Sequence, residues 1–409
     1  MKIVEINTVD IGSTGRIMLQ IAQTVRHNKD KVWTFSMARR RPCEPPEGHR
    51  YYLSYPEYCV HNVLAKLTGG NGLFSIGATL RLLRSIRKID PDIIHLHNLH
   101  GFSINLPLLF RYIKRNDIPT VWTLHDCWAF TGKCPYFTMV KCDKWKTGCS
   151  HCPQLKGYPK ALLDMSRMMW KLKKKCFTGV PNMTIVTPSQ WLCDLVKKSY
   201  LKDYDIKVIN NGIDLETFRP TPSNFREKYG IDKAQHIVLF VAFGWEARKG
   251  LDVVINLAGT LPENYQIVVV GTDDDVDKEL PANILSIHRT QNQRELAEIY
   301  TVADLFVNPT REENFPTVNM EALACGTPVI TFKTGGSPEI LDETCGIVVP
   351  CDDTLALEDA VRYVCEEKPF SSESCRKHAL QFDMNDKFAE YVQLYQEICK
   401  DKSKEITRL

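Results

Sequence analysis

The sequence lacks any run of about 20 apolar residues, the length that a membrane-spanning helix needs. It also lacks a signal-peptide pattern, because its start, MKIVEINTVD, reads as a short buried strand. We therefore expect a cytoplasmic protein. Internal repeats and low-complexity segments are absent, and a net charge of only +3 gives no reason to expect a nucleic-acid partner.

The composition is that of a globular protein. Of the 409 residues, 44% are hydrophobic and 25% are charged, and this length predicts two domains. Cysteine is the exception. The chain has 15 cysteines, which is many for a cytoplasmic protein, and five of them lie between Cys127 and Cys152.

Short apolar runs alternate with helical patterns in both halves of the chain. Lys2–Ile6 predicts a strand and Ile17–Val25 a helix, and Ile237–Phe243 and Leu251–Leu257 repeat this order in the second half. Such alternation is typical of an α/β protein with parallel sheets. Ligands bind at the carboxyl ends of parallel strands, so the loops that follow strands are the first places to look for a site.

The most informative loop lies within Arg311–Gly326, REENFPTVNMEALACG. An apolar strand, Ala303–Pro309, precedes it, and a helix is predicted at Met320–Cys325. Glu313 therefore lies on the loop and Glu321 in the helix, whose start offers free N–H groups to an anion. This arrangement suits a nucleotide sugar, which has hydroxyls at both ends and phosphates between them. An ordinary strand–helix unit with one capping and one surface glutamate is the alternative.

The segment Glu313-x7-Glu321, followed by ALACGTPVI, resembles the donor-site motif of family-4 retaining glycosyltransferases of the GT-B type. The resemblance covers most of the chain and implies an α/β fold with two Rossmann-like, doubly wound domains facing across a cleft. It implies an acceptor-side domain at residues 1–211, joined by a returning C-terminal helix at about 386–405, and a nucleotide-sugar-binding domain at residues 212–385.

The resemblance also implies a role for each part of this motif. Glu321 binds the ribose hydroxyls and Glu313 the sugar hydroxyls, which makes Glu313 the acid whose loss should reduce turnover most. The backbone at Phe315, Pro316 and Thr317 helps to stabilise the developing charge of the diphosphate.

A second donor element follows the first strand of the second half. The turn from Gly244 to Gly250 carries Arg248 and Lys249 directly before a helix, where two cations can clamp a diphosphate. In the family, an arginine early in this turn and a lysine before its last glycine neutralise the phosphates. Lys249 matches the lysine, but Trp245 stands where arginine is usual, so Arg248 is the nearest substitute. A solvated basic turn is the alternative.

In the first half, the turn after the first strand contains Gly12, Gly15 and Arg16. Glycines at such a turn let a ligand approach the backbone, although Gly-x-x-Gly is also typical of a plain tight turn. Arg16 can meet a diphosphate or an acceptor anion. The resemblance implies that Gly12 and Gly15 help to hold the donor phosphate.

Histidines follow two strands of the first half. His95, His97 and His100 surround the end of one strand, with a spacing that fits metal ligands but also simple alternation on a strand end. The resemblance places His97 and His100 on the acceptor side. His125 ends another strand in a Thr-x-His-Asp element, whose histidine contacts the transferred sugar in the family.

A cysteine-rich insertion hangs from His125, at residues 127–152. Its thiols can wrap a structural zinc, since a Cys-x2-Cys pair is a normal half-site. A [4Fe–4S] cluster, buried free thiols and disulfides are the alternatives. We expect a structural flap over the acceptor side rather than a catalytic metal site. The five cysteines are Cys127, Cys134, Cys142, Cys149 and Cys152.

Lys160–Phe177 combines helical spacing of apolar residues with several lysines. Such a helix can lie on an anionic bilayer, so peripheral contact with the inner membrane surface, at its cytoplasmic face, is one prediction. A domain helix with a solvated basic end is the alternative.

Together these features predict a retaining glycosyltransferase that moves a sugar from a UDP- or GDP-sugar to a glycan or polyprenyl-linked acceptor in polysaccharide biosynthesis. The resemblance implies that Glu313, His125 and Lys249 carry the chemistry and that no catalytic metal is needed. A phosphorylase or epimerase of the same fold is one alternative, although no extra phosphate or cofactor signal is present. A non-catalytic partner subunit is another, but it would be expected to have lost Glu313, Glu321 or Lys249.

Overall fold

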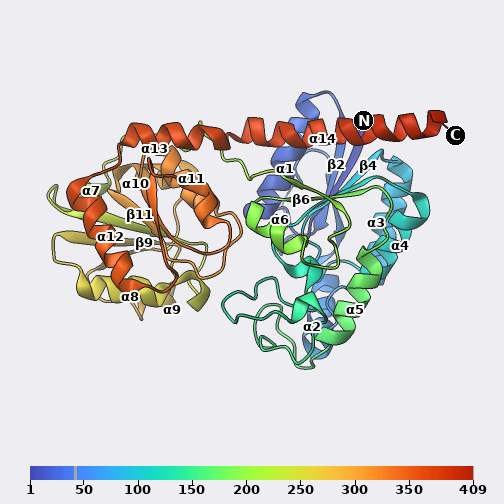
Figure 1. Cartoon of the computed structure of the whole chain (residues 1–409), viewed down its shortest axis with the longest axis horizontal. Helices are drawn as coiled ribbons and strands as arrows, with labels where there is room; N and C mark the ends of the chain where they lie inside the picture. The colour runs from blue at the N-terminus through green and yellow to red at the C-terminus, as the bar shows by residue number, and fades with distance from the viewer. Residues whose placement is uncertain (41–43, 409) are drawn as a thin grey trace. The chain divides into compact units, whose positions relative to one another are not determined.

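The computed structural model describes the backbone of residues 1–40 and 44–408, and the side chains of residues 1–40 and 44–400. The chain forms two compact units (Figure 1). The first comprises Met1–Asn210 and the chain from Asn385 onward, and the second comprises Asn211–Met384. No helix among the described residues has the length and apolar character that crossing a membrane requires.

The first unit is built on a seven-stranded sheet whose neighbouring strands are all parallel. Parallel neighbours need crossover connections, which explains why helices separate most of the strands along the chain. In sheet order the strands are β3 (His49–Leu53), β2 (Lys31–Met37), β1 (Lys2–Ile6), β4 (Ile93–Leu96), β5 (Thr120–Thr123), β6 (Met183–Thr187) and β7 (Asp205–Val208).

The two faces of this sheet differ in chemistry, because successive strand residues point to opposite sides. Val4 and Ile6 join a large apolar core, whereas Glu5 and His95 point to the other face, where Tyr395 of the last helix meets His95. The helices are α1 (Gly12–His27), α2 (Tyr55–Thr68), α3 (Ile76–Ile89), α4 (Leu106–Asn116), α5 (Ser166–Phe177), α6 (Gln190–Val196) and α14 (Met384–Arg408), with short 3-10 helices η1 (Trp128–Phe130) and η2 (Lys144–Lys146).

The second unit has a six-stranded sheet, again with parallel neighbours. Its strands are buried on both faces, as their nearly continuous apolar sequences predict. In sheet order they are β10 (Ile284–Ile287), β9 (Tyr265–Val270), β8 (His236–Val241), β11 (Leu305–Asn308), β12 (Val329–Phe332) and β13 (Gly346–Val349).

Two separate cores cover the faces of the second sheet. Ile237 and Leu239 of β8 pack with residues of α10, α11 and α13, whereas Val238 and Phe240 pack with residues of α8 and α12. The helices are α7 (Phe225–Tyr229), α8 (Leu251–Thr260), α9 (Asp274–Asp277), α10 (Gln293–Val302), α11 (Thr317–Ala324), α12 (Thr354–Glu367) and α13 (Ser372–Ala379), with η3 (Ala247–Lys249), η4 (Ser337–Ile340) and η5 (Leu380–Phe382).

Both units have the predicted Rossmann-like, doubly wound arrangement, but two local predictions are wrong. The helix expected at Lys160–Phe177 begins only at Ser166, because the residues before it run beside α2, where the Leu162 N–H donates to Lys66 O at 2.7 Å. The helix expected at Met320–Cys325 begins earlier, at Thr317, with a proline at its N-cap.

Candidate functional site

An ion pair between Lys249 and Glu313 lies at the centre of the predicted donor site in the second unit. Lys249 Nζ lies 2.6 Å from Glu313 Oε2, and the Asn314 N–H donates to Glu313 Oε1 at 3.1 Å. Burial acts to raise the pKa of the Glu313 carboxyl, but the charge and hydrogen bond of Lys249, the charge of Arg248 and the Asn314 N–H together outweigh this effect, and the pKa is lowered. The pair is therefore largely buried, and it joins the turn after β8 to the loop after β11.

Gly335 lets two loops approach each other beside this pair. Its φ is +56°, and a Cβ there would lie only 1.7 Å from the Glu313 carbonyl oxygen. The N–H of Gly336 donates to Asn314 O at 2.8 Å. Because β11 and β12 are neighbours, the loop after one strand holds the loop after the other, and any side chain at Gly335 would displace Glu313.

Helix α11 carries the rest of the predicted donor motif. Phe315 and Pro316 are buried, and Thr317 is the first helical residue. One turn later, Glu321 is 6% exposed, and the Tyr300 hydroxyl lies 3.4 Å from its Oε2. A helix start and a carboxylate thus lie on successive turns of one element.

Arg248 and Arg311 connect the Lys249 turn to the Glu313 loop. Arg248 Nη1 donates to Glu312 O at 2.9 Å, and the Arg311 N–H donates to Arg248 O at 2.8 Å. The positive charge of Arg248 also contributes to lowering the pKa of Glu313. Two cations, Lys249 and Arg248, therefore lie close to this carboxylate.

In the first unit, the two glycines of the turn after β1 have different surroundings. Gly12 begins α1, and no atom lies within 4 Å of the place that its Cβ would take. Gly15 is buried against Asp10, whose carbonyl carbon would lie 2.5 Å from an added Cβ. Close packing explains Gly15, whereas Gly12 leaves open space that a ligand can use. Arg16 is exposed.

His125 lies just after β5 and stacks on His97. The ring centroids are 5.4 Å apart with an angle of 13° between the planes, and His97 Nδ1 lies 3.1 Å from His125 Nε2. Burial lowers the pKa of His125 to about 4 and holds the pKa of His97 well below its usual value. Both rings are therefore neutral at neutral pH.

His100 has a different partner. Its Nε2 lies 2.8 Å from Asp126 Oδ2, and its Nδ1 lies 3.3 Å from the Tyr158 hydroxyl. His97, His100 and His125 nevertheless line one hollow of the first unit. Within the part of the chain that the structure describes, the three histidines at the end of β4 do not gather as one ligand set, although His95 and His97 form a possible ligand group with Glu5.

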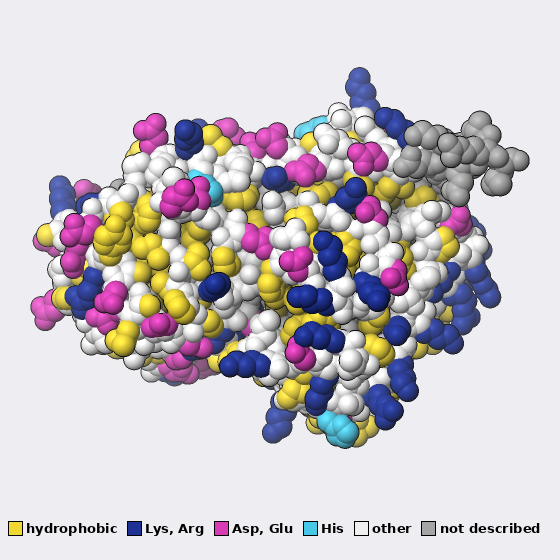
Figure 2. Space-filling view, in the orientation of Figure 1, with side chains coloured by type: hydrophobic (Ala, Val, Ile, Leu, Met, Phe, Trp, Pro, Cys, Tyr) yellow, Lys and Arg dark blue, Asp and Glu magenta, His cyan; other side chains and the backbone are white. Residues whose placement is uncertain are grey.

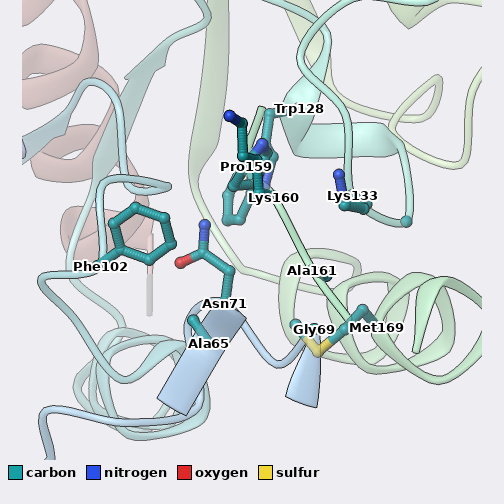
Figure 3. A pocket seen from close by; sticks show the side chains of 11 residues that line it. Ala65, Gly69, Asn71, Phe102, Trp128, Lys133, Pro159, Lys160, Ala161 and Met169 are labelled. Carbon is teal, nitrogen blue, oxygen red and sulfur yellow. The ribbon is translucent and has the colours of Figure 1, made fainter. Parts of the chain in front are cut away.

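A second hollow lies beside Trp128, where the insertion meets α2 (Figure 3). Asn71, Phe102 and Lys133 contribute to its wall, together with residues 159–161. Lys133 Nζ donates to two carbonyl oxygens of the 154–157 segment, at 2.9 and 2.8 Å. Lys133 thus ties the insertion together rather than offering an open charge.

The cysteines of the insertion are unlinked and largely shielded. Burial raises the pKa of Cys134 to about 12 and that of Cys149 to about 11, and the neighbouring thiols Cys142 and Cys152 add to both shifts. Cys127 lies in the main apolar core. Two groups of described residues place three ligand atoms within 4.8 Å of one another, namely Glu5 with His95 and His97, and Asp342 with Cys345 and His378; the insertion thiols do not form a third.

Sequence reasoning missed two charged residues in these regions. Asp126 follows His125 directly and orients His100, a role that its place in the Thr-x-His-Asp element could have indicated. Glu5 is completely buried in the middle of β1, and a charged residue inside an otherwise apolar strand was the available signal.

Comparison with known families covers most of the chain. Residues 14–217 match the family described as Glycosyltransferase Family 4, and residues 223–382 match the family described as Glycosyl transferases group 1. These matched segments contain His97, His100 and His125 in the first case and Lys249, Glu313 and Glu321 in the second.

Individual relatives and solved structures agree with these matches. The chain is 25% identical to the putative colanic acid biosynthesis glycosyl transferase WcaC of Escherichia coli K12, over 85% of this chain and 88% of that protein. The structure resembles sucrose-phosphate synthase from Thermosynechococcus elongatus, with a TM-score of 0.71, 18% identity and coverage of 97% and 98% of the two chains. It also resembles HepE of Anabaena in complex with UDP-glucose, with a TM-score of 0.66, 15% identity and coverage of 99% and 100%.

Proposed function

The chain belongs to the family-4 glycosyltransferases with a GT-B fold, and we propose that it transfers a sugar from a UDP-sugar to a glycan or polyprenyl-linked acceptor with retention of anomeric configuration. The observation that carries this proposal is the pair between Lys249, in the turn after β8, and Glu313, in the loop that leads into α11. A cation from the turn after β8, a carboxylate from the loop after β11 and the start of α11 together suit the diphosphate and the sugar of one donor.

Each of these groups has a distinct task in the proposed reaction. Lys249, with Arg248, offsets the negative charge that develops on the departing diphosphate, and the N–H groups at Phe315 and Thr317 add preorganised dipoles. Glu313 accepts hydrogen bonds from the sugar hydroxyls, and Glu321 accepts them from the ribose. Because Lys249 is paired with Glu313 before donor binds, the diphosphate takes over a cation that is already in place.

The first unit supplies the acceptor side of the proposal. His125 contacts the transferred sugar, His97 and His100 line the hollow beside it, and Gly12 leaves room for the donor phosphate. Arg16 is exposed at the same turn and meets an anionic group of donor or acceptor. No catalytic metal is needed, because cations of the chain perform the charge compensation.

The relatives support the choice of substrates. WcaC is named for colanic acid biosynthesis, which supports a role in polysaccharide assembly, and HepE was solved with UDP-glucose, which favours UDP over GDP as the leaving group.

Calorimetric titration with UDP, GDP and ADP tests the donor site. We expect UDP to bind most tightly and Glu321→Ala to weaken that binding by about tenfold or more, since it removes a buried acceptor. Glu343→Ala is the matched control, because Glu343 is exposed in the same unit. If none of the three diphosphates binds at millimolar concentration, the donor-site proposal is wrong.

Proton NMR of the product tests retention. The coupling constant of the anomeric proton in the new glycoside should match that of the donor sugar. A coupling constant that indicates the opposite anomeric configuration would overturn the proposed retention, but it would not affect the donor-site proposal.

We also propose a structural zinc in the insertion, held by Cys134, Cys142, Cys149 and Cys152. These four thiols influence one another electrostatically, and their spacing ends in a Cys-x2-Cys half-site. Zinc bound by four thiolates carries a net charge of about −2. Lys173 is completely buried near Cys149 and Cys134, so its ammonium would offset part of that charge. Binding would have to draw the sulfur atoms closer together.

Contact with an anionic membrane surface is a further part of the proposal, on residues other than those expected. Met169, Trp170 and Phe177 of α5 are buried, so this helix is a domain helix with a solvated basic end. Several exposed apolar residues lie together on α2 and in the loop that runs beside it, among them Val60, Val63, Leu67, Leu162 and Leu163. Figure 2 shows Lys and Arg side chains gathered over the α4–α5 side of the first unit, and such charges favour anionic lipid.

A further inference from the structure

Three buried side chains of the first unit form a line that ends at His125. His97 Nδ1 lies 3.1 Å from His125 Nε2, and His97 Nε2 lies 3.6 Å from Glu5 Oε2. Glu5 is 0% exposed, His97 1% and His125 9%. A carboxyl group deep in the sheet is thus connected through one ring to the histidine at the end of β5.

The strand geometry accounts for this line. Glu5 of β1 is in register with His95 of β4, and side chains two residues apart on a strand share a face, so His97 follows on the same side. His95 already has two partners, because its Nδ1 lies 2.6 Å from the Tyr395 hydroxyl and its Nε2 lies 2.8 Å from Thr123 Oγ1. His97 Nε2, in contrast, lies 3.6 Å from Glu5 Oε2 and makes no hydrogen bond with another described residue.

Glu5 and His97, at the inner end of this line, have polar atoms that form no hydrogen bond with the described residues. Both carboxyl oxygens of Glu5 and Nε2 of His97 are buried and have no hydrogen-bond partner among the described residues. A buried polar group without a partner is costly, and a small rotation of the Glu5 side chain would satisfy one oxygen and the ring nitrogen together. Burial raises the pKa of Glu5 well above its usual value, against a smaller opposing effect of Arg26, and therefore favours the neutral carboxyl.

Counting protons along the line leaves one consistent arrangement. Neutral Glu5 has one O–H, which donates to His97 Nε2. The single proton of neutral His97 is then on Nδ1 and donates to His125 Nε2, which leaves the proton of His125 on Nδ1. If His97 instead carried its proton on Nε2, the O–H of Glu5 would have no acceptor among these three side chains.

We propose that Glu5 is a positioning residue that acts through His97 to hold His125 in its Nδ1–H tautomer, so that His125 offers a hydrogen-bond donor rather than an acceptor. A donor suits a hydroxyl or ring oxygen of a sugar. The consequence for transfer rests on the proposed role of His125, whereas the tautomer itself does not.

Two variants of Glu5 separate hydrogen bonding from packing. In Glu5→Gln the amide N–H2 can still donate to His97 Nε2, and in Glu5→Leu nothing can. Two-bond proton–nitrogen correlation spectra of 15N-histidine-labelled protein report which ring nitrogen of His125 carries the proton, with His125→Gln used to assign its signals. We expect Nδ1–H in the parent protein and in Glu5→Gln, and a mixture of tautomers in Glu5→Leu.

The kinetic result should follow the tautomer. Glu5→Leu should lower kcat at least about tenfold with little change in KM for the donor, while Glu5→Gln should stay within about threefold of the parent protein. A tautomer change in Glu5→Leu without loss of kcat would uphold the line of hydrogen bonds and overturn the role of His125 in transfer.

Three results would overturn the proposal. One is an Nε2–H tautomer of His125 in the parent protein. Another is a folded Glu5→Leu variant whose His125 tautomer does not change. The third is a stoichiometric metal that is lost on Glu5→Gln substitution, because Glu5, His95 and His97 also place three ligand atoms within 4.8 Å of one another.

Discussion

At the scale of single residues, Lys249 has the sharpest consequence for catalysis. The departing diphosphate gains negative charge, and Lys249 is the cation that forms an ion pair with Glu313. Removal of one preorganised group from such a site typically lowers kcat about 10²–10³-fold. We expect Lys249→Ala to have an effect of this size in a sugar-transfer assay, with little change in KM for the acceptor.

Lys278→Ala provides the comparison, because Lys278 is an exposed lysine of the same unit that pairs with Asp275. It should change kcat less than about twofold. Equal rates for the two variants, with both folded, would remove Lys249 from the mechanism.

Buried histidines make the first unit sensitive to acid. Burial lowers the pKa of His61 to about 4, that of His95 to about 3 and that of His125 to about 4. Histidine in the unfolded chain titrates near about 6.5, so below that pH the unfolded state binds more protons than the folded state. Stability is therefore complete above about pH 6.5 and falls as the pH drops toward 4, by roughly 3 kcal/mol for each histidine.

Urea unfolding at a series of pH values from 4 to 7 measures this dependence. His61→Gln should reduce the slope of the free energy of unfolding against pH, because the glutamine does not titrate. An unchanged slope would mean that other groups control the acid sensitivity.

The local pattern predicts Glu313 and Glu321 well and Glu5 poorly. The motif places one glutamate on a loop and the other in a helix, and α11 confirms both positions. The partner of Glu5 is His97, which lies on another strand far along the chain. No local pattern contains that pairing, because the sheet creates it.

At the scale of elements, α2 and the loop beside it carry a group of exposed apolar side chains of the first unit. Leu162 is 73% exposed and Leu163 61%, and α2 adds four further exposed apolar side chains. Apolar side chains gain free energy by entering the boundary between headgroups and acyl chains, and nearby lysines add attraction to anionic lipid. We expect the double variant Leu162→Asp, Leu163→Asp to reduce binding to anionic vesicles by about tenfold or more.

Co-sedimentation with vesicles that contain phosphatidylserine, compared with vesicles of phosphatidylcholine alone, measures this binding. Leu355→Asp is the control, since Leu355 is 76% exposed on α12 of the second unit. Unchanged sedimentation of the double variant would show that Leu162 and Leu163 do not form the membrane contact.

The insertion has its own prediction, which concerns metal content. Elemental analysis of the purified protein should find about one zinc per chain. Cys142→Ser and Cys149→Ser should each lose it, because a structural site needs four ligands. Cys127→Ser should retain it, because Cys127 is not among the thiols that influence Cys134, Cys149 and Cys152. Zinc-free protein of full stability, or equal loss in all three variants, would exclude this site.

The elements that could be predicted are those with strong local signals. Strands β1, β8 and β9 are short runs rich in apolar residues, and the structure confirms them. Helix α2 was not predicted, although Ser54 and Glu57 form a capping box at its start, because proline, glycine and tyrosine obscure the helical pattern around it. The predicted start of α5 is too early because the helical spacing of apolar residues continues through Leu162 and Met165 into the preceding loop.

At the scale of the whole molecule, the alternation of strands and helices predicts parallel sheets and the resemblance implies two doubly wound domains, but the order of the strands follows from contacts between distant segments. Helix α14 is the clearest case. It begins at the end of the second unit and continues as part of the first, where Phe388, Tyr391 and Tyr395 are buried. The resemblance implied this return, whereas periodicity alone indicates only a helix.

The return of α14 predicts that its tyrosines stabilise the first unit. Tyr395 is 0% exposed, so Tyr395→Ala should lower the free energy of unfolding of that unit by about 3–5 kcal/mol. Tyr395→Phe removes only the partner of His95 Nδ1 and should cost about 1–3 kcal/mol. Urea unfolding followed by tryptophan fluorescence is suitable, because six of the seven tryptophans lie in the first unit. Tyr363→Ala, at a 50% exposed site on α12, should change the transition by less than about 0.5 kcal/mol. A Tyr395→Ala transition that coincides with the Tyr363→Ala transition would show that α14 contributes little to the stability of the first unit.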